Sequence, residues 1–143
     1  GKLFIVGGNN ATTRFVDVHT LNLLTMKWSN PKSTGDVPVD NEALKYKKFT
    51  VNAKKHGCII VGTMMINYGL GTDGSIYTVD LAGVETLQDV KSIMWVKVGG
   101  QFPAIECNEL IGVSKNSEGS MALTIGGLIN GTKTNSVFQI KCN

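Results

Sequence analysis

The residues in this sequence that could do chemistry are few, and their spacing decides what they can do. Two glycines and two asparagines at residues 7–10 directly follow an apolar run at residues 3–6. A glycine turn after a strand can hold the phosphates of a dinucleotide, but that fingerprint also needs a helix directly after the turn and an acidic residue further on. A loop and a second strand pattern follow here instead, so the sequence argues against a nucleotide site.

Metal and hydrolase chemistry also lack the residues they need. The two histidines, His19 and His56, have no second histidine, cysteine or aspartate nearby at a ligand spacing. No G-x-S-x-G motif is present to carry a nucleophilic serine. We therefore expect no catalytic residue, no metal and no cofactor.

The cysteines and two sequons bear on the compartment. Cys58, Cys107 and Cys142 are odd in number and form no close C-x-x-C pair, so free thiols are expected, whereas one disulfide with a leftover thiol would suit a secreted chain. Asn10 and Asn130 each begin an N-glycosylation sequon in a predicted loop. A cytoplasmic location is favoured, and the sequons leave a secreted protein or ectodomain open.

The composition describes one globular domain. The chain has 143 residues, of which 42% are hydrophobic and 17% charged, which excludes a disordered tail or a charge-rich coiled coil. No apolar run approaches the roughly 20 residues of a membrane-spanning helix, and no signal peptide is visible. The net charge of +3 comes mainly from lysine, with Arg14 as the single arginine, which is a poor signature for nucleic-acid binding.

Short strand patterns occupy almost the whole chain. They are separated by clusters of Gly, Asn, Pro and Ser, which predicts an all-β domain. Helical periodicity is nearly absent, and only single turns are expected, near residues 41–49 and 84–93.

Three apolar strands that end in glycine recur along the chain, at residues 3–8, 58–63 and 122–127. Each leads through a polar loop to an alternating strand with a ring at its second position. The corresponding glycines are Gly7, Gly62 and Gly126, with Gly8 and Gly127 beside two of them. The corresponding rings are His19, Tyr77 and Phe138.

A third and a fourth strand complete the unit. The third carries Trp28 in the first unit and Trp95 in the second, and the fourth is expected at residues 49–53 and 110–114. The chain therefore holds about two and a half units, at residues 1–38, 39–103 and 104–143. One sheet of four antiparallel strands cannot bury both faces, so we expect the sheets to stack, with tryptophans and rings between them.

These motifs resemble kelch repeats, and so the blades of a β-propeller. The resemblance rests on the double glycines, on "DVHTLNLLTMKW" at residues 17–28, on "YTVDL" at residues 77–81 with Trp95, and on a Gly-x-x-Pro segment in each of the first two units. It covers almost the whole chain. It implies blades of four antiparallel strands in an incomplete ring. The chain would then be a fragment of a larger propeller, or it would complete one with other segments or copies.

The resemblance implies a non-catalytic scaffold that binds partner proteins through loops on the propeller faces. Arg14 and Tyr68 are the leading candidates, since arginine and tyrosine are favoured interface anchors. The candidate contact residues are Asn9, Arg14, Asn67, Tyr68, Asp73, Thr132 and Lys133.

Two alternatives stay open. One is a secreted, glycosylated propeller of the galactose-oxidase-like or carbohydrate-related type, including a copper radical oxidase, whose copper would need ligands from several blades. The other is a structural segment that only completes the ring. The expected partners are proteins and the remaining blades, from the same protein or another copy, with no nucleic acid and no membrane span.

Overall fold

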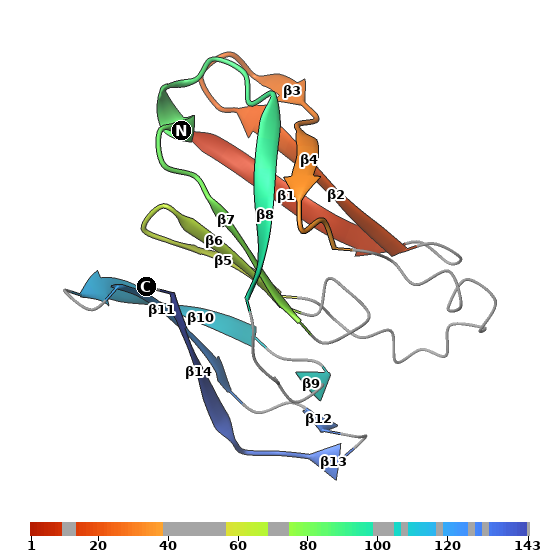
Figure 1. The fold of residues 1–143 in the computed structure, drawn as a ribbon, viewed down its shortest axis with the longest axis vertical. Coiled ribbons are helices and arrows are strands. Elements are labelled where there is room, and N and C mark those ends of the chain that lie inside the picture. Colours follow the sequence, from red (N-terminus) through yellow and green to blue (C-terminus); the bar gives the residue numbers. More distant parts are fainter. Residues whose placement is uncertain are drawn as a thin grey trace.

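The computed structural model describes residues 1–9, 14–38, 57–68 and 75–98, and, further along, residues 105–106, 109–116, 119–125, 128–129 and 132–142. Within these ranges the chain is mostly β-strand, which confirms the predicted all-β class (Figure 1). The helical content of the same ranges is the 3-10 turn η2 (Val84–Thr86), which lies inside the segment where the sequence predicted one turn. None of the helical structure in the described part of the chain is long and apolar enough to cross a membrane.

The first sheet contains β1 (Lys2–Asn9), β2 (Arg14–Asn22) and β3 (Lys27–Ser29), in that order and with antiparallel neighbours. The register of β1 against β2 shifts between Val6 and Gly8. Gly7 and Gly8 have φ angles of 64° and 126°, values that favour glycine. The glycine pair therefore forms a bulge within β1, which increases the local twist of the sheet.

The second sheet has five strands. Its order is β4 (Lys32–Gly35), β8 (Ser92–Val98), β7 (Ile76–Asp80), β6 (Met64–Tyr68) and β5 (Gly57–Val61). Strands β5 to β8 are each antiparallel to the next, whereas β4 crosses from the first sheet and pairs with β8 in parallel. Strand β4 was not expected, because its sequence "KSTG" is polar and its pairing joins residues far apart in the chain.

Strand β6 was also not predicted from the sequence, and its presence changes which strand of the second sheet corresponds to β1. The ring residues show the correspondence, because each lies opposite one residue of a neighbouring antiparallel strand. The opposed pairs are His19 with Ile5, Tyr77 with Asn67 and Phe138 with Thr124. The strand of the second sheet that corresponds to β1 is therefore β6, and not residues 58–63.

Gly62 accordingly has a different role from the one predicted. It lies with Thr63 in the two-residue turn between β5 and β6, with a φ of 63°. Tight antiparallel hairpins require such positive φ values, which glycine adopts without strain. The predicted correspondence of Gly62 with Gly7 and Gly126 is wrong. The residues opposite the three rings are Ile5, Asn67 and Thr124, and the residue two positions after each of them is a glycine. The corresponding glycines are therefore Gly7, Gly69 and Gly126.

The third sheet contains β10 (Glu109–Asn116), β11 (Gly119–Ile125) and β14 (Val137–Cys142), again antiparallel, and β10 includes the strand predicted at residues 110–114. A small sheet of β13 (Thr132–Lys133), β12 (Leu128–Ile129) and β9 (Ile105–Glu106) accompanies it. Strand β5 of the second sheet lies against β10 and β11 (Figure 1). The fourth strand predicted at residues 49–53, the turn at residues 41–49, and Gly126 and Gly127 lie outside the described residues.

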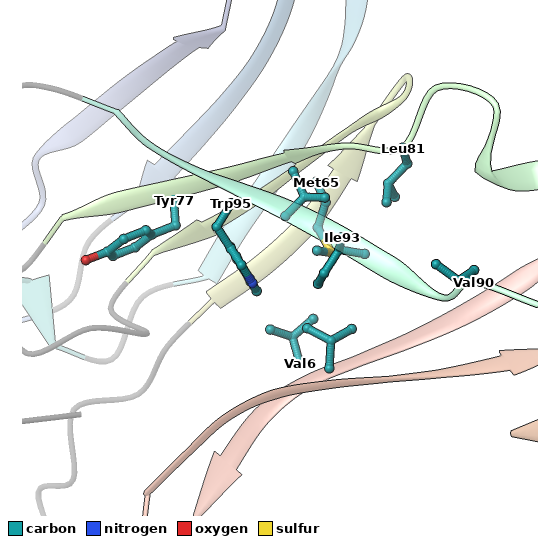
Figure 2. Packing of buried hydrophobic residues seen from close by; sticks show 9 residues of the cluster. Val6, Met65, Tyr77, Leu81, Val90, Ile93 and Trp95 are labelled. Atoms are coloured by element: carbon teal, nitrogen blue, oxygen red, sulfur yellow. The ribbon is translucent and has the colours of Figure 1, made fainter. Parts of the chain in front are cut away.

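The core lies between the first and second sheets (Figure 2). Burial of such side chains is the main stabilising term, at about 1.5 to 3 kcal/mol for each large apolar side chain. The first sheet contributes Val6 and Val18, the second sheet contributes Met65, Tyr77, Val79, Ile93 and Trp95, and the connection between β7 and β8 contributes Leu81 and Val90.

The two tryptophans have different environments. Trp95 is 1% exposed, meets the Tyr77 ring edge to face at 6.4 Å between centroids, and donates a hydrogen bond from Nε1 to Ser33 Oγ at 3.1 Å. Trp28 is 55% exposed. The expectation that tryptophans fill the space between sheets therefore holds for Trp95, whereas the face that carries Trp28 is open.

Candidate interaction surface

The turn between β2 and β3 carries the two most exposed large apolar side chains among the residues that the structure describes. Leu24 is 88% exposed and Met26 is 68% exposed. The Asn22 side chain fixes the turn, because its Oδ1 accepts hydrogen bonds from the backbone N–H groups of Leu24 at 3.0 Å and Thr25 at 3.2 Å. Met26 closes the turn with a φ of 54°. Within this fixed turn, Leu24 and Met26 are open to solvent.

The same asparagine connects this turn to the second sheet. Asn22 Nδ2 donates a hydrogen bond to the carbonyl oxygen of Gln88 at 2.9 Å, in the connection between β7 and β8. Leu87, beside it, is 48% exposed. Figure 1 shows the β2–β3 turn and the β7–β8 connection at the same end of the molecule. Flexible apolar side chains such as Leu and Met adapt well to the surface of a protein partner.

Two of the predicted contact residues lie together at the opposite end of the first sheet. Asn9 ends β1 and Arg14 begins β2, and the strand register places them opposite each other. Thr132 and Lys133 form β13 and are both exposed, so they are available for contact. Next to them, the Thr134 and Ser136 side chains form a hydrogen bond of 2.8 Å.

Asn67 does not lie in a loop. It is a residue of β6 and is 0% exposed, so the prediction that it contacts a partner is wrong. Tyr68 was also expected in a loop, but it is the last residue of the same strand, opposite Ile76. Asp73 and the sequon residues Asn10 and Asn130 lie outside the described residues.

The side chain of Asn67 has no hydrogen-bond partner at either Nδ2 or Oδ1. Its strand neighbours in register are Cys58 on β5 and Tyr77 on β7. A buried amide without partners costs about 1 to 3 kcal/mol. No pattern in the sequence distinguishes this asparagine from the exposed ones.

Cys58 carries a thiol that is not activated. It is free of any disulfide, and although part of the residue is exposed, desolvation by the surrounding protein raises the pKa of the thiol to about 11. The thiol is therefore protonated at neutral pH, whereas a nucleophilic or metal-binding cysteine needs the thiolate. Among the residues that the structure describes, no three His, Cys, Asp or Glu side chains gather as a metal site would require.

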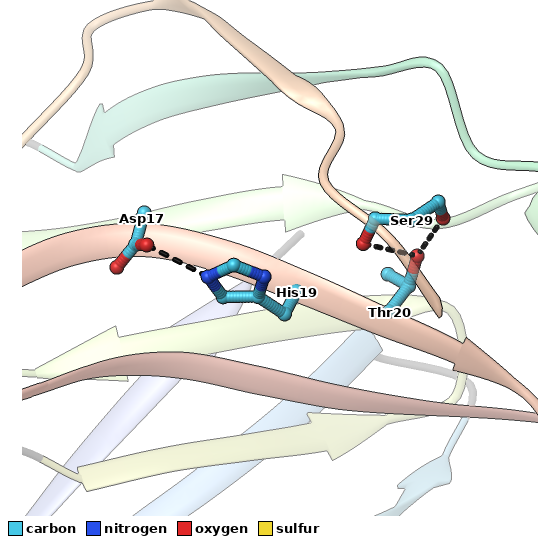
Figure 3. Close-up of polar contacts among 4 residues, drawn as sticks. All are labelled: Asp17, His19, Thr20 and Ser29. Atoms are coloured by element: carbon cyan, nitrogen blue, oxygen red, sulfur yellow. Dashed lines mark hydrogen bonds and ion pairs between the residues drawn. The ribbon is translucent and has the colours of Figure 1, made fainter. Parts of the chain in front are cut away.

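His19 occupies the ring position of the first sheet, but it does not pack as Tyr77 does. Its Nε2 lies 2.8 Å from Oδ2 of Asp17 on the same face of β2 (Figure 3). The two side chains are 43% and 45% exposed. An exposed pair of this kind contributes little to stability, about 0 to 1 kcal/mol. On the opposite face, the Thr20 hydroxyl bonds with the Ser29 hydroxyl and fixes β3 against β2.

Comparison with known proteins gives partial similarities. No protein-family model matches the chain. The Rho GTPase-activating protein gacHH of Dictyostelium discoideum is 31% identical over 74 residues, which are 52% of this chain and 4% of that protein. Acyl-CoA-binding domain-containing protein 4 of Arabidopsis thaliana is 28% identical over 143 residues, which are 97% of this chain and 19% of that protein. The chain thus spans a small part of each relative's length.

Proposed function

We propose that this chain is a segment of a kelch-type β-propeller and that it acts as a non-catalytic scaffold for protein partners. The observation that carries the proposal is the stacking of the first two sheets, whose shared core contains Tyr77 and Trp95. A propeller buries the faces of its antiparallel sheets in this way, sheet against sheet around an axis. On this proposal the remaining blades come from the same protein or another copy.

The contact surfaces that we propose are two segments at the ends of the sheets. One is the end of the first sheet with Asn9 and Arg14, and another is β13 with Thr132 and Lys133. Such segments carry binding functions on many rigid scaffolds. Their positive side chains favour partners with acidic surfaces, because complementary charge speeds association and selects the partner. The activities named for the two relatives are not transferred, since this chain covers so little of either.

The proposal is tested with a double charge reversal, Arg14→Glu with Lys133→Glu. Proteins captured from the native cells by the unchanged chain are quantified by mass spectrometry and compared with those captured by the variant. We expect at least a tenfold loss of specific partners, since each reversed charge repels an acidic surface.

The matched control is Lys91→Glu, which makes the same kind of charge change at an exposed lysine away from both surfaces. Its capture profile should equal that of the unchanged chain. Equal capture by the double variant, or stoichiometric copper with turnover in the purified protein, would contradict the scaffold proposal.

A further inference from the structure

We draw no further inference here: the strongest candidate, the surface patch of exposed Leu24, Met26 and Leu87 where the β2–β3 turn meets the β7–β8 connection, carries no proposal because nothing in the structure shows what covers it.

Discussion

At the scale of single residues, Asn67 fits its surroundings least well. It is fully buried in β6, and neither side-chain polar atom has a hydrogen-bond partner. The corresponding position in the first sheet is the apolar Ile5, which pairs with His19 as Asn67 pairs with Tyr77. The repeat therefore accommodates an apolar side chain at this position, and the amide is a local source of instability.

Replacing Asn67 with leucine should stabilise the protein. The change removes the unpaired amide and keeps the same branched shape of four side-chain heavy atoms, so we expect the free energy of unfolding to rise by about 1 to 2 kcal/mol. Urea denaturation followed by circular dichroism measures the change. Thr78→Val is the control, because it removes a buried hydroxyl that does donate a hydrogen bond, to the Val96 carbonyl at 3.4 Å, and should bring no gain. A loss of stability in Asn67→Leu would show that the amide has a partner.

At the scale of elements, the path of β4 depends on one glycine. Gly35 ends β4 with a φ of 74°, and a Cβ atom there would collide with the Trp95 carbonyl oxygen. Asp36 continues the contact, since its backbone N–H donates to that carbonyl at 2.9 Å and its Oδ2 accepts from the Lys97 N–H at 3.0 Å. The glycine therefore permits the close approach that joins β4 to β8.

Gly35→Ala should be clearly more destabilising than Gly83→Ala. Both glycines have nearly the same φ, 74° and 76°, but no atom lies within 4 Å of a Cβ built at Gly83. At Gly83, the left-handed backbone alone should lower the free energy of unfolding by about 1 to 2 kcal/mol. At Gly35, the collision should lower it by at least about 1 kcal/mol more. Chemical denaturation of the two variants gives the difference. Equal losses of stability in the two variants would contradict this, because they would mean that β4 can shift away from β8 without destabilising the protein.

The sequence was informative about elements whose signals are local. Alternating apolar residues and turn residues predict the all-β class, the ring-bearing strands and the strand around Trp95. Strand β6 was missed because its apolar residues follow those of β5 after only Gly62 and Thr63, so two strands read as one strand and a loop. The burial of Asn67 and the exposure of Trp28 were not predictable, since they depend on which sheet covers which.

At the scale of the whole molecule, the first two sheets share one core. Val6 and Val18 from the first sheet belong to the same buried cluster as Met65 and Trp95 from the second. Val6, Met65 and Trp95 are labelled in Figure 2. Neither sheet can expose its inner face without exposing that of the other. The first and second sheets should therefore unfold as one cooperative unit, as small domains with a common core usually do.

Two single-tryptophan variants test this cooperativity. Trp95→Phe keeps Trp28 as a fluorescent probe of the first sheet, and Trp28→Phe keeps Trp95 as a probe of the second. Within each variant, the fluorescence and circular dichroism transitions in urea should coincide. Trp95→Phe should have the lower midpoint, because it removes a buried ring and the hydrogen bond to Ser33. Fluorescence of Trp28 that changes at lower urea than the circular dichroism signal would contradict a shared unit.

The parallel pairing of β4 with β8 has a consequence for folding during protein synthesis. Strand β4 leaves the ribosome before its partner, because the residue paired with Lys32 is Ser92, about 60 residues later in the chain. Contacts between residues so distant in sequence form slowly, because a long loop must close first. The nascent chain must therefore hold β4 unpaired, with its backbone groups available to other strands, until translation has passed Val98.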